Sequence, residues 1–279
     1  NTELPTYATG LKVNSVPDLL RALRPGQPAM DPRSLEHMNA LLTTEASCGY
    51  AANSALWQKA ENARQKSRQM VQGGLDTLFD FGANTPAMQE LRAYYGFAAN
   101  ALTSPEAQAA LAMRALTSGI ARCVSITVSP GLDTQFENWG RDQGPFQLRG
   151  FNAVARLARD LERTQYKDTG DSWLDHTTIV GFSEFSRTSR INDRSGRDHA
   201  LTNACFLLGG KVKGGTVVGA SSDYFLAPQP VNLQTGAVHE DGEIIKPEHV
   251  LQTLFDEAGL TGDPADLRVN PIPALIHRA

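Results

Sequence analysis

The feature that most constrains the fold is an alternation of strand-like and helical patterns in the second half of the chain. Residues 120–129 (IARCVSITVS) form a β-branched run that a Pro-Gly pair ends. Residues 146–164 then carry apolar side chains at helical spacing, and residues 176–182 (HTTIVGF) form another strand-like run. This order predicts a right-handed crossover between two parallel strands. We therefore expect an α/β fold with a mostly parallel sheet flanked by helices.

Further elements follow toward the C-terminus. Short strands are expected at residues 204–208 and 216–218, on either side of a turn that contains four glycines. A closing helix is expected over residues 247–258, where Gly259 supplies a typical helix stop. We expect the strands near residues 124, 177 and 204 to lie in one sheet, with the helix of residues 146–164 packed on it.

The first part of the chain is rich in Ala, Gln and Leu at helical spacing. Helices are expected from Pro17-Asp18, from Ser34, and from about Asn53 to Phe79. The triplets Asn84-Thr85-Pro86 and Ser104-Pro105-Glu106 are typical helix starts, with a polar cap followed by Pro. We therefore divide the chain into a mainly helical region, 1–118, packed on an α/β core, 119–279.

Charge and hydropathy exclude some classes of function. The formal net charge is −4, and the pI is near 5.9. Lys and Arg residues are scattered, which argues against binding to nucleic acid. The densest basic stretch is interleaved with Glu61 and predicts a solvated helix face: Lys59, Arg64, Lys66 and Arg68. No apolar run approaches the roughly 20 residues that a membrane span requires.

Three cysteines are too few for a disulfide scaffold, and their number is odd. Cys123 and Cys205 lie in apolar runs and are expected to be small core residues, whereas Cys48 is the thiol expected to be exposed.

The first residue is Asn and no leader pattern follows it. We therefore expect the chain to be processed or cut at its start.

Polar residues of catalytic type follow the expected strand ends. Asp133 comes after the first strand, Ser183-Glu184 closes the second, and the loop before the third carries five more: Arg187, Arg190, Arg197, Asp198 and His199. Ligands bind at the carboxyl ends of strands in open parallel sheets. Carboxylates and a His there suit a divalent metal, and arginines suit a phosphate or sulfate. The alternative is that Glu184 pairs with Arg187 or Arg197 and pins a loop.

Several consecutive motifs resemble the DUF1501 family. Residues 177–192 (TTIVGFSEFSRTSRIN) and 196–199 (GRDH) are similar to the family's strand, SEFGRTPRIN and GRDH. Residues 207–223 resemble its Gly-rich hairpin, and residues 247–260 resemble its closing helix. The resemblance is strong from about Val124 onward and diffuse before that.

The resemblance carries expectations about chemistry, because the family is grouped with alkaline phosphatases and sulfatases. It implies an alkaline-phosphatase-like core and a divalent metal (zinc, magnesium or calcium) that polarises an ester oxygen. The implied metal ligands are Asp133, Glu184, Asp198 and His199. Arg187 and Arg197 are the implied anion-binding residues. No nucleophile is assigned, and the catalytic residues stay unknown.

The resemblance also implies export, commonly by a twin-arginine leader, to the periplasm or the extracellular space.

Where the family reads WDTH, this chain reads Leu132-Asp133-Thr134-Gln135, and an amide oxygen is a weaker ligand than imidazole. Ser186 and Ser189 replace a Gly and a Pro of the signature. The N-terminal half of the family, which would supply a nucleophile, has no recognisable counterpart.

Two classes of function follow. One is a secreted metal-dependent hydrolase of phosphate or sulfate esters, favoured by Glu184 and by residues 197–199. The other is a non-catalytic descendant that acts as a binding or structural component, with protein partners in an envelope or extracellular assembly. Gln135 and the missing N-terminal half favour the second, so we expect a degenerate site that holds a divalent metal weakly or has lost it.

Overall fold

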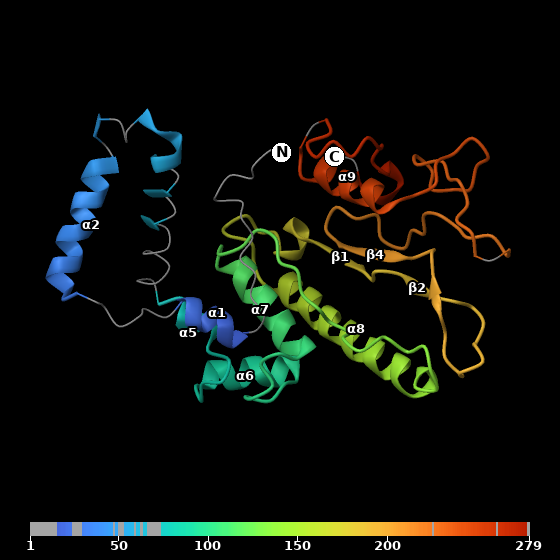
Figure 1. Ribbon diagram of the computed structural model, residues 1–279, viewed down its shortest axis with the longest axis horizontal. Helices are drawn as coiled ribbons and strands as arrows, with labels where there is room; N and C mark the ends of the chain where they lie inside the picture. The colour runs from blue at the N-terminus through green and yellow to red at the C-terminus, as the bar shows by residue number, and fades with distance from the viewer. Residues whose placement is uncertain are drawn as a thin grey trace. The chain divides into compact units, whose positions relative to one another are not determined.

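The computed structural model describes residues 16–23, 30–46, 48–49, 53–58, 60–61, 64–65, 74–224, 226–260 and 262–277 (Figure 1). The chain divides into two compact units, Asn1–Val128 and Ser129–Ala279, and each is described by itself. The boundary expected at residues 118 and 119 thus falls inside the first of these units.

Helices build the described part of the first unit, as the sequence predicts. They are α1 (Val16–Leu23), α2 (Pro32–Ala46), α5 (Asp76–Phe79), α6 (Pro86–Tyr95) and α7 (Pro105–Thr117). Both expected caps are confirmed: the Thr85 hydroxyl accepts a hydrogen bond from the Met88 N–H, and the Ser104 hydroxyl accepts one from the Ala107 N–H. Each cap satisfies an N–H group that the first helical turn leaves unpaired.

Aromatic side chains form the core of the first unit, where α1 packs on α5 and α7. Phe79 and Phe81 are completely buried. The Phe81 ring centroid lies 6.3 Å from that of Phe79 and 6.0 Å from that of Phe97. Arg92 of α6 donates hydrogen bonds to the carbonyls of Phe81 and Ala83, at 2.6 and 2.9 Å. The loop before α6 is therefore held by both rings and a guanidinium.

The solvated helix face expected around Glu61 is wrong for Glu61 and Arg64, which are both described by the structure. Glu61 is only 8% exposed, and Arg64 donates to both of its carboxylate oxygens. Arg64 also donates to the buried Asn39 of α2, and the Thr43 hydroxyl donates to Glu61 at 3.1 Å. Outside the described residues lie Lys59, Lys66, Arg68 and much of the helix expected over 53–79.

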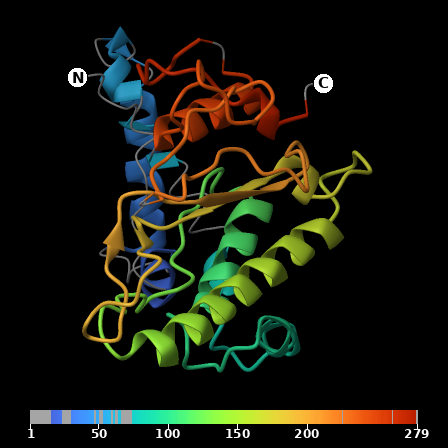
Figure 2. The ribbon, with the colours of Figure 1, turned by 90° about the vertical axis from the view of Figure 1, so that its right-hand side faces the viewer.

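Three layers make up the middle of the second unit (Figures 1 and 2). A two-stranded ribbon of β1 (Thr178–Phe182) and β4 (Cys205–Gly209) lies between α8 (Trp139–Arg163) and α9 (Pro247–Glu257). On one side, the ring of Phe151 in α8 lies 5.7 Å from that of Phe206 in β4. On the other, the Thr178 hydroxyl donates to the Glu257 carboxylate.

The mostly parallel sheet predicted from the sequence is wrong. The described residues hold two antiparallel two-stranded sheets: β1 with β4, in a register from Thr178↔Gly209 to Phe182↔Cys205, and β2 (Ser186–Arg187) with β3 (His199–Ala200). The strands near residues 177 and 204 do share a sheet, as expected. No helix joins them, however, and a chain that reverses without a crossover pairs antiparallel.

Two of the expected strands do not form. Residues 120–129 and 216–218 belong to no strand of the structure. Because residues 120–129 form no strand, β1 has no parallel neighbour there. The crossover predicted between these two segments is therefore missing. The expected burial of Cys123 and Cys205 is also wrong, because both side chains are exposed, as is that of Cys48. Cys205 ends the ribbon opposite Phe182, which is itself 79% exposed.

Gly181 allows α8 to engage the ribbon. A Cβ atom at this position would lie 2.1 Å from the Phe206 ring, so the ring rests directly on the glycine backbone. The same ring contacts Phe151 of α8. The absence of a side chain in β1 therefore makes room for the aromatic contact that joins the helix to the ribbon.

A second apolar cluster lies near α9 and contains Val231, Leu233, Ile272 and Ala274. Beside it, the buried His249 joins α9 to the preceding loop. Its Nδ1 accepts a hydrogen bond from the Lys246 N–H, so Nε2 carries the proton and faces the Glu243 carboxylate at 3.2 Å. Hydrogen bonds from Asn270 and His249 hold the pKa of Glu243 below its usual value. These hydrogen bonds place His249 in a structural network.

No helix in the described residues is both long and apolar enough to cross a membrane.

Glu61 should make the stability of the chain depend on acid. Its hydrogen bonds with Arg64 lower its pKa from 4.5 to about 2 in the folded protein. The carboxylate therefore stabilises the fold fully above pH 4.5, and this contribution is lost as the pH falls toward 2. Glu61→Gln should lower the free energy of unfolding at neutral pH and reduce its fall between these two pH values. Urea denaturation at a series of pH values measures this.

The matched control is Glu36→Gln, which removes an exposed carboxylate of α2. It should leave the acid dependence as it is in the wild type. A Glu61→Gln profile that runs parallel to the wild type over the whole range would contradict the assignment.

Candidate functional site

The candidate site lies where two loops of the second unit meet. One loop precedes α8 and carries Asp133, and the other, residues 183–204, connects β1 to β4. Within the second loop, β2 and β3 pair so that Arg187 lies directly opposite His199. This short antiparallel pairing brings together residues that are twelve positions apart in the sequence.

Asp133 receives two hydrogen bonds on one carboxylate oxygen. Gln135 donates to its Oδ1 at 2.7 Å, and Arg187 donates to the same atom at 3.3 Å. These bonds, with smaller contributions from the charges of Arg187 and His199, lower the pKa of Asp133 below its ordinary value. The Asp133 side chain is nevertheless 74% exposed. The structure thus brings Asp133, Arg187 and His199 into one neighbourhood, with Gln135 bonded to the carboxylate.

The two signature arginines bond to the backbone, and we call Arg187 and Arg197 the arginine clamp. Arg187 donates to the Leu132 carbonyl at 2.7 Å and to the Arg197 carbonyl at 3.2 Å, and its side chain is only 11% exposed. Arg197 donates to the carbonyls of Thr188 and Ser189. The clamp therefore holds the loop of residues 183–204 closed and ties it to the loop before α8.

Aromatic rings pack against the charged groups of the same loops. The Arg197 guanidinium lies 4.8 Å from the ring centroid of Trp139, and its Nε is buried without a partner among the described residues. The His199 ring stacks on Phe185 with the ring centroids 3.8 Å apart. The Arg187 guanidinium lies 5.3 Å from the centroid of that same Phe185 ring. These contacts add to the backbone hydrogen bonds of the clamp.

Asn192 organises the turn between the two arginines, and the sequence analysis did not single it out. Its Oδ1 accepts hydrogen bonds from the N–H groups of Arg194 and Gly196, both at 3.0 Å. Its Nδ2 donates to Asp198 Oδ1 at 2.8 Å and to the Gln135 carbonyl at 3.1 Å. Both donors and both acceptor lone pairs of the amide are used. The signal for this role is the Asn-Asp-Arg-Ser-Gly composition, which is typical of a turn.

The predicted metal ligands have different surroundings. Asp198 bonds to Asn192 and lies 3.7 Å from an Arg194 nitrogen. Glu184 is exposed, and no hydrogen bond or ion pair of its side chain is found among the described residues. Its alternative pairing with Arg187 or Arg197 does not form either. Asp133 is the carboxylate that reaches the clamp.

The positions of the acidic and His side chains decide whether the site can hold a metal. Within the described ranges, no group of three or more His, Cys, Asp or Glu side chains gathers closely enough to hold an ion. A metal site needs co-ligands within about 4 Å of one another, as bonds of about 2.0–2.3 Å to one ion require. Among the described residues, the implied ligands therefore do not gather into a metal-binding group. What the arrangement does is fix two loops against each other.

At Gly196 the two loops approach each other backbone to backbone. A Cβ atom there would lie 2.1 Å from the backbone carbon of Gln135. Gly196→Ala should therefore force the loops apart and lower the free energy of unfolding by about 1–3 kcal/mol. Gly214→Ala is the matched control, because a Cβ atom there meets nothing within 4 Å. Equal unfolding free energies for the two variants in urea titrations would show that the contact is absent.

Comparison with known proteins places the chain in a family. Residues 4–242 match the model of a family described as "Protein of unknown function (DUF1501)". The match begins much closer to the N-terminus than the sequence motifs suggested, and it ends before α9. No curated protein and no solved structure matches the chain. Because the match covers most of the chain and includes both loops of the candidate site, the chain belongs to the DUF1501 family.

Proposed function

We propose that this chain is a non-catalytic binding or structural component of a cell envelope or extracellular assembly. In this proposal the signature loops are a degenerate metal-hydrolase site that survives as a structural support. The observation that carries the proposal is the use of the arginine clamp. Both guanidinium groups donate to backbone carbonyls of the two loops. An arginine that orients a phosphate or sulfate needs its planar donor fork free for the anion.

Gln135 supports the proposal from the side of the metal. It stands where the family resemblance implies a His ligand, and its amide donates to Asp133 Oδ1. That oxygen also accepts from Arg187, so two hydrogen bonds compete with any cation for it. A loss of one nitrogen ligand weakens the hold on a metal, and a weakly held metal activates its bound oxygen less.

The second candidate is the secreted metal-dependent hydrolase of phosphate or sulfate esters. The observation that favours it is the proximity of Asp133 and His199, since the charge of His199 contributes to the low pKa of Asp133. In this alternative, Asp133, Glu184, Asp198 and His199 would supply oxygen and nitrogen donors for zinc, magnesium or calcium after the loops rearrange. The arginine clamp would then have to release its carbonyls to meet the anion.

Export to the periplasm or the extracellular space is part of the proposal. It rests on the family resemblance, which implies a twin-arginine leader, and on no contact within the structure. The protein partners of the assembly belong to the same proposal. Cell fractionation of the native protein tests the compartment, and recovery from the cytoplasm alone would contradict export.

We predict little or no hydrolysis of phosphate and sulfate monoesters by the wild-type chain. Wild type and Gln135→His should be assayed side by side with p-nitrophenyl phosphate and p-nitrophenyl sulfate, each with added zinc, magnesium or manganese. Metal binding should be measured in parallel by calorimetry. Because the clamp arginines stay bonded to carbonyls in both proteins, the added His alone should raise metal affinity more than turnover.

The control is the double variant Gln135→His/His199→Ala, which removes the nearest implied nitrogen ligand. Any metal affinity that Gln135→His gains should fall again in this variant. Robust metal-dependent turnover by the wild type would overturn the non-catalytic proposal in favour of the hydrolase. If neither the wild type nor the Gln135→His variant binds metal, the hydrolase candidate loses its support.

A further inference from the structure

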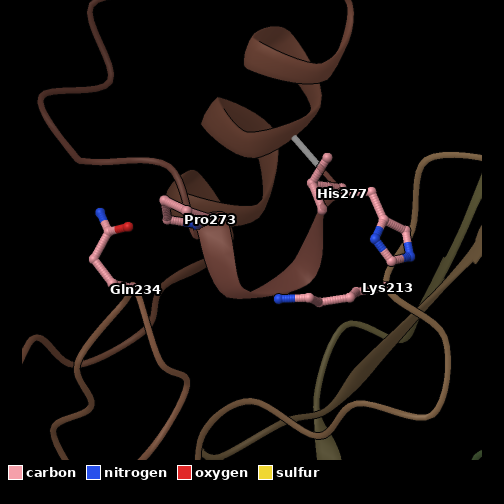
Figure 3. Close-up of a pocket in the computed structure, with 5 residues that line it drawn as sticks. Lys213, Gln234, Pro273 and His277 are labelled. Carbon is pink, nitrogen blue, oxygen red and sulfur yellow. The ribbon is translucent and has the colours of Figure 1, made fainter. Parts of the chain in front are cut away.

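We propose that a pocket in the second unit, away from the signature loops, binds a small organic anion that carries a carboxylate or phosphate group. The pocket has a volume of about 370 Å³ and is open to solvent (Figure 3). Its lining residues are Lys213, Gln234, Pro273, Ile276 and His277. None of them belongs to the arginine clamp or to the predicted metal ligands, so this inference does not depend on the proposed function.

Backbone pairing fixes the two basic residues of the pocket. Val212 and Ile276 form an antiparallel bridge, which hydrogen bonds extend on both sides. The Lys213 N–H donates to the Leu275 carbonyl at 2.8 Å, and the His277 N–H donates to the Lys211 carbonyl at 2.9 Å. Alternate side chains of paired extended segments point to the same face. Lys213 and His277 therefore lie on one face, diagonal to each other across the bridge.

Gln234 is fixed on the opposite wall by a side-chain-capped turn. Asn232 Oδ1 accepts hydrogen bonds from the N–H groups of Gln234 and Thr235, at 2.9 and 3.1 Å. The Ala274 N–H donates to the Leu233 carbonyl at 3.1 Å, which joins this turn to the segment that carries Pro273. In Figure 3 the Lys213 side chain extends beneath that segment, with its nitrogen directed toward the side of Gln234. The walls are therefore tied to one another through the backbone.

The donors of the pocket are unused. No hydrogen bond or ion pair of the Lys213, Gln234 or His277 side chains is found in the part of the chain that the structure describes. The neighbouring Lys211, by contrast, donates its Nζ to the Glu257 carbonyl at 3.1 Å. An ammonium, an amide and an imidazole are all hydrogen-bond donors, and among the described residues no carboxylate lines the pocket with them.

The lining specifies the chemistry of the ligand. An ammonium with an amide and an imidazole around one opening favours an anionic group, because charge-assisted hydrogen bonds are the strongest that such donors form. Pro273 adds apolar surface beside these donors. A small organic anion can bury its hydrocarbon part on Pro273 and direct its carboxylate or phosphate to Lys213.

Calorimetric titration of the full chain with inorganic phosphate, and separately with acetate and isobutyrate, tests the proposal. We expect saturable binding of one anion per chain. The tighter of phosphate and acetate identifies the preferred anionic group, and isobutyrate should bind more tightly than acetate because of the apolar wall. Lys213→Gln should weaken binding by about tenfold or more, since a hydrogen bond to a charged group is lost.

Lys211→Gln is the matched control. It removes the same charge two positions away from Lys213, and the Lys211 side chain already donates a hydrogen bond to the Glu257 carbonyl. Anion binding by this variant should stay within about twofold of the wild type. Circular dichroism establishes that each variant is folded. If Lys213→Gln fails to fold, His277→Gln takes its place and should also weaken binding. Absence of saturation with all three anions, or equal affinity of Lys213→Gln and Lys211→Gln, would overturn the proposal.

Discussion

The backbone of the long connection between β1 and β4 must satisfy its hydrogen-bonding groups without a sheet to do so, and the architecture of the candidate site depends on how it does this. Only Ser186–Arg187 and His199–Ala200 pair as strands within residues 183–204. Buried backbone carbonyls and N–H groups need partners. Side chains supply several of them: the arginine clamp binds carbonyls, and Asn192 binds N–H groups on one side and a carbonyl on the other.

This constraint gives the signature residues a reason that does not require catalysis. A loop held by Arg187, Arg197 and Asn192 would open if any of them turned toward a ligand. Asp133 fits the same account, because its carboxylate faces both Arg187 and the amide of Gln135. Gly196 completes it by letting the loops touch backbone to backbone. The signature residues therefore have the properties expected of groups that hold two loops together.

Local features of the fold could be predicted from the sequence, and non-local ones could not. The caps Thr85 and Ser104 act on N–H groups of the adjacent helical turn, so the sequence predicts both. The strand β1 and the helix α9 also follow from local patterns. Strand pairing depends on segments far apart in the chain, and periodicity does not specify it. The β-branched run at residues 120–129 therefore predicted a parallel sheet, whereas β1 pairs with β4 in antiparallel register.

The same distinction applies to individual residues. Cys205 lies in an apolar run, but it ends a ribbon whose last pair is exposed to solvent. Glu61 lies in a basic stretch, but Asn39 and Thr43 of α2 enclose its partner Arg64. In the candidate site, the motifs locate the right loops and the neighbourhood of Asp133, Arg187 and His199. They do not reveal that the guanidinium groups face carbonyls, because that depends on the folded path of the backbone.

The central claim, that the signature arginines hold the loops, is tested most directly by amide hydrogen exchange in residues 188–198. Arg197→Gln should be compared with Arg190→Gln, which removes an exposed arginine of the same loop whose side chain has no hydrogen bond or ion pair among the described residues. The account predicts faster exchange across this segment in Arg197→Gln, about tenfold or more for the loss of charge-assisted hydrogen bonds, and wild-type exchange in Arg190→Gln. Unchanged protection of the segment in Arg197→Gln would contradict it.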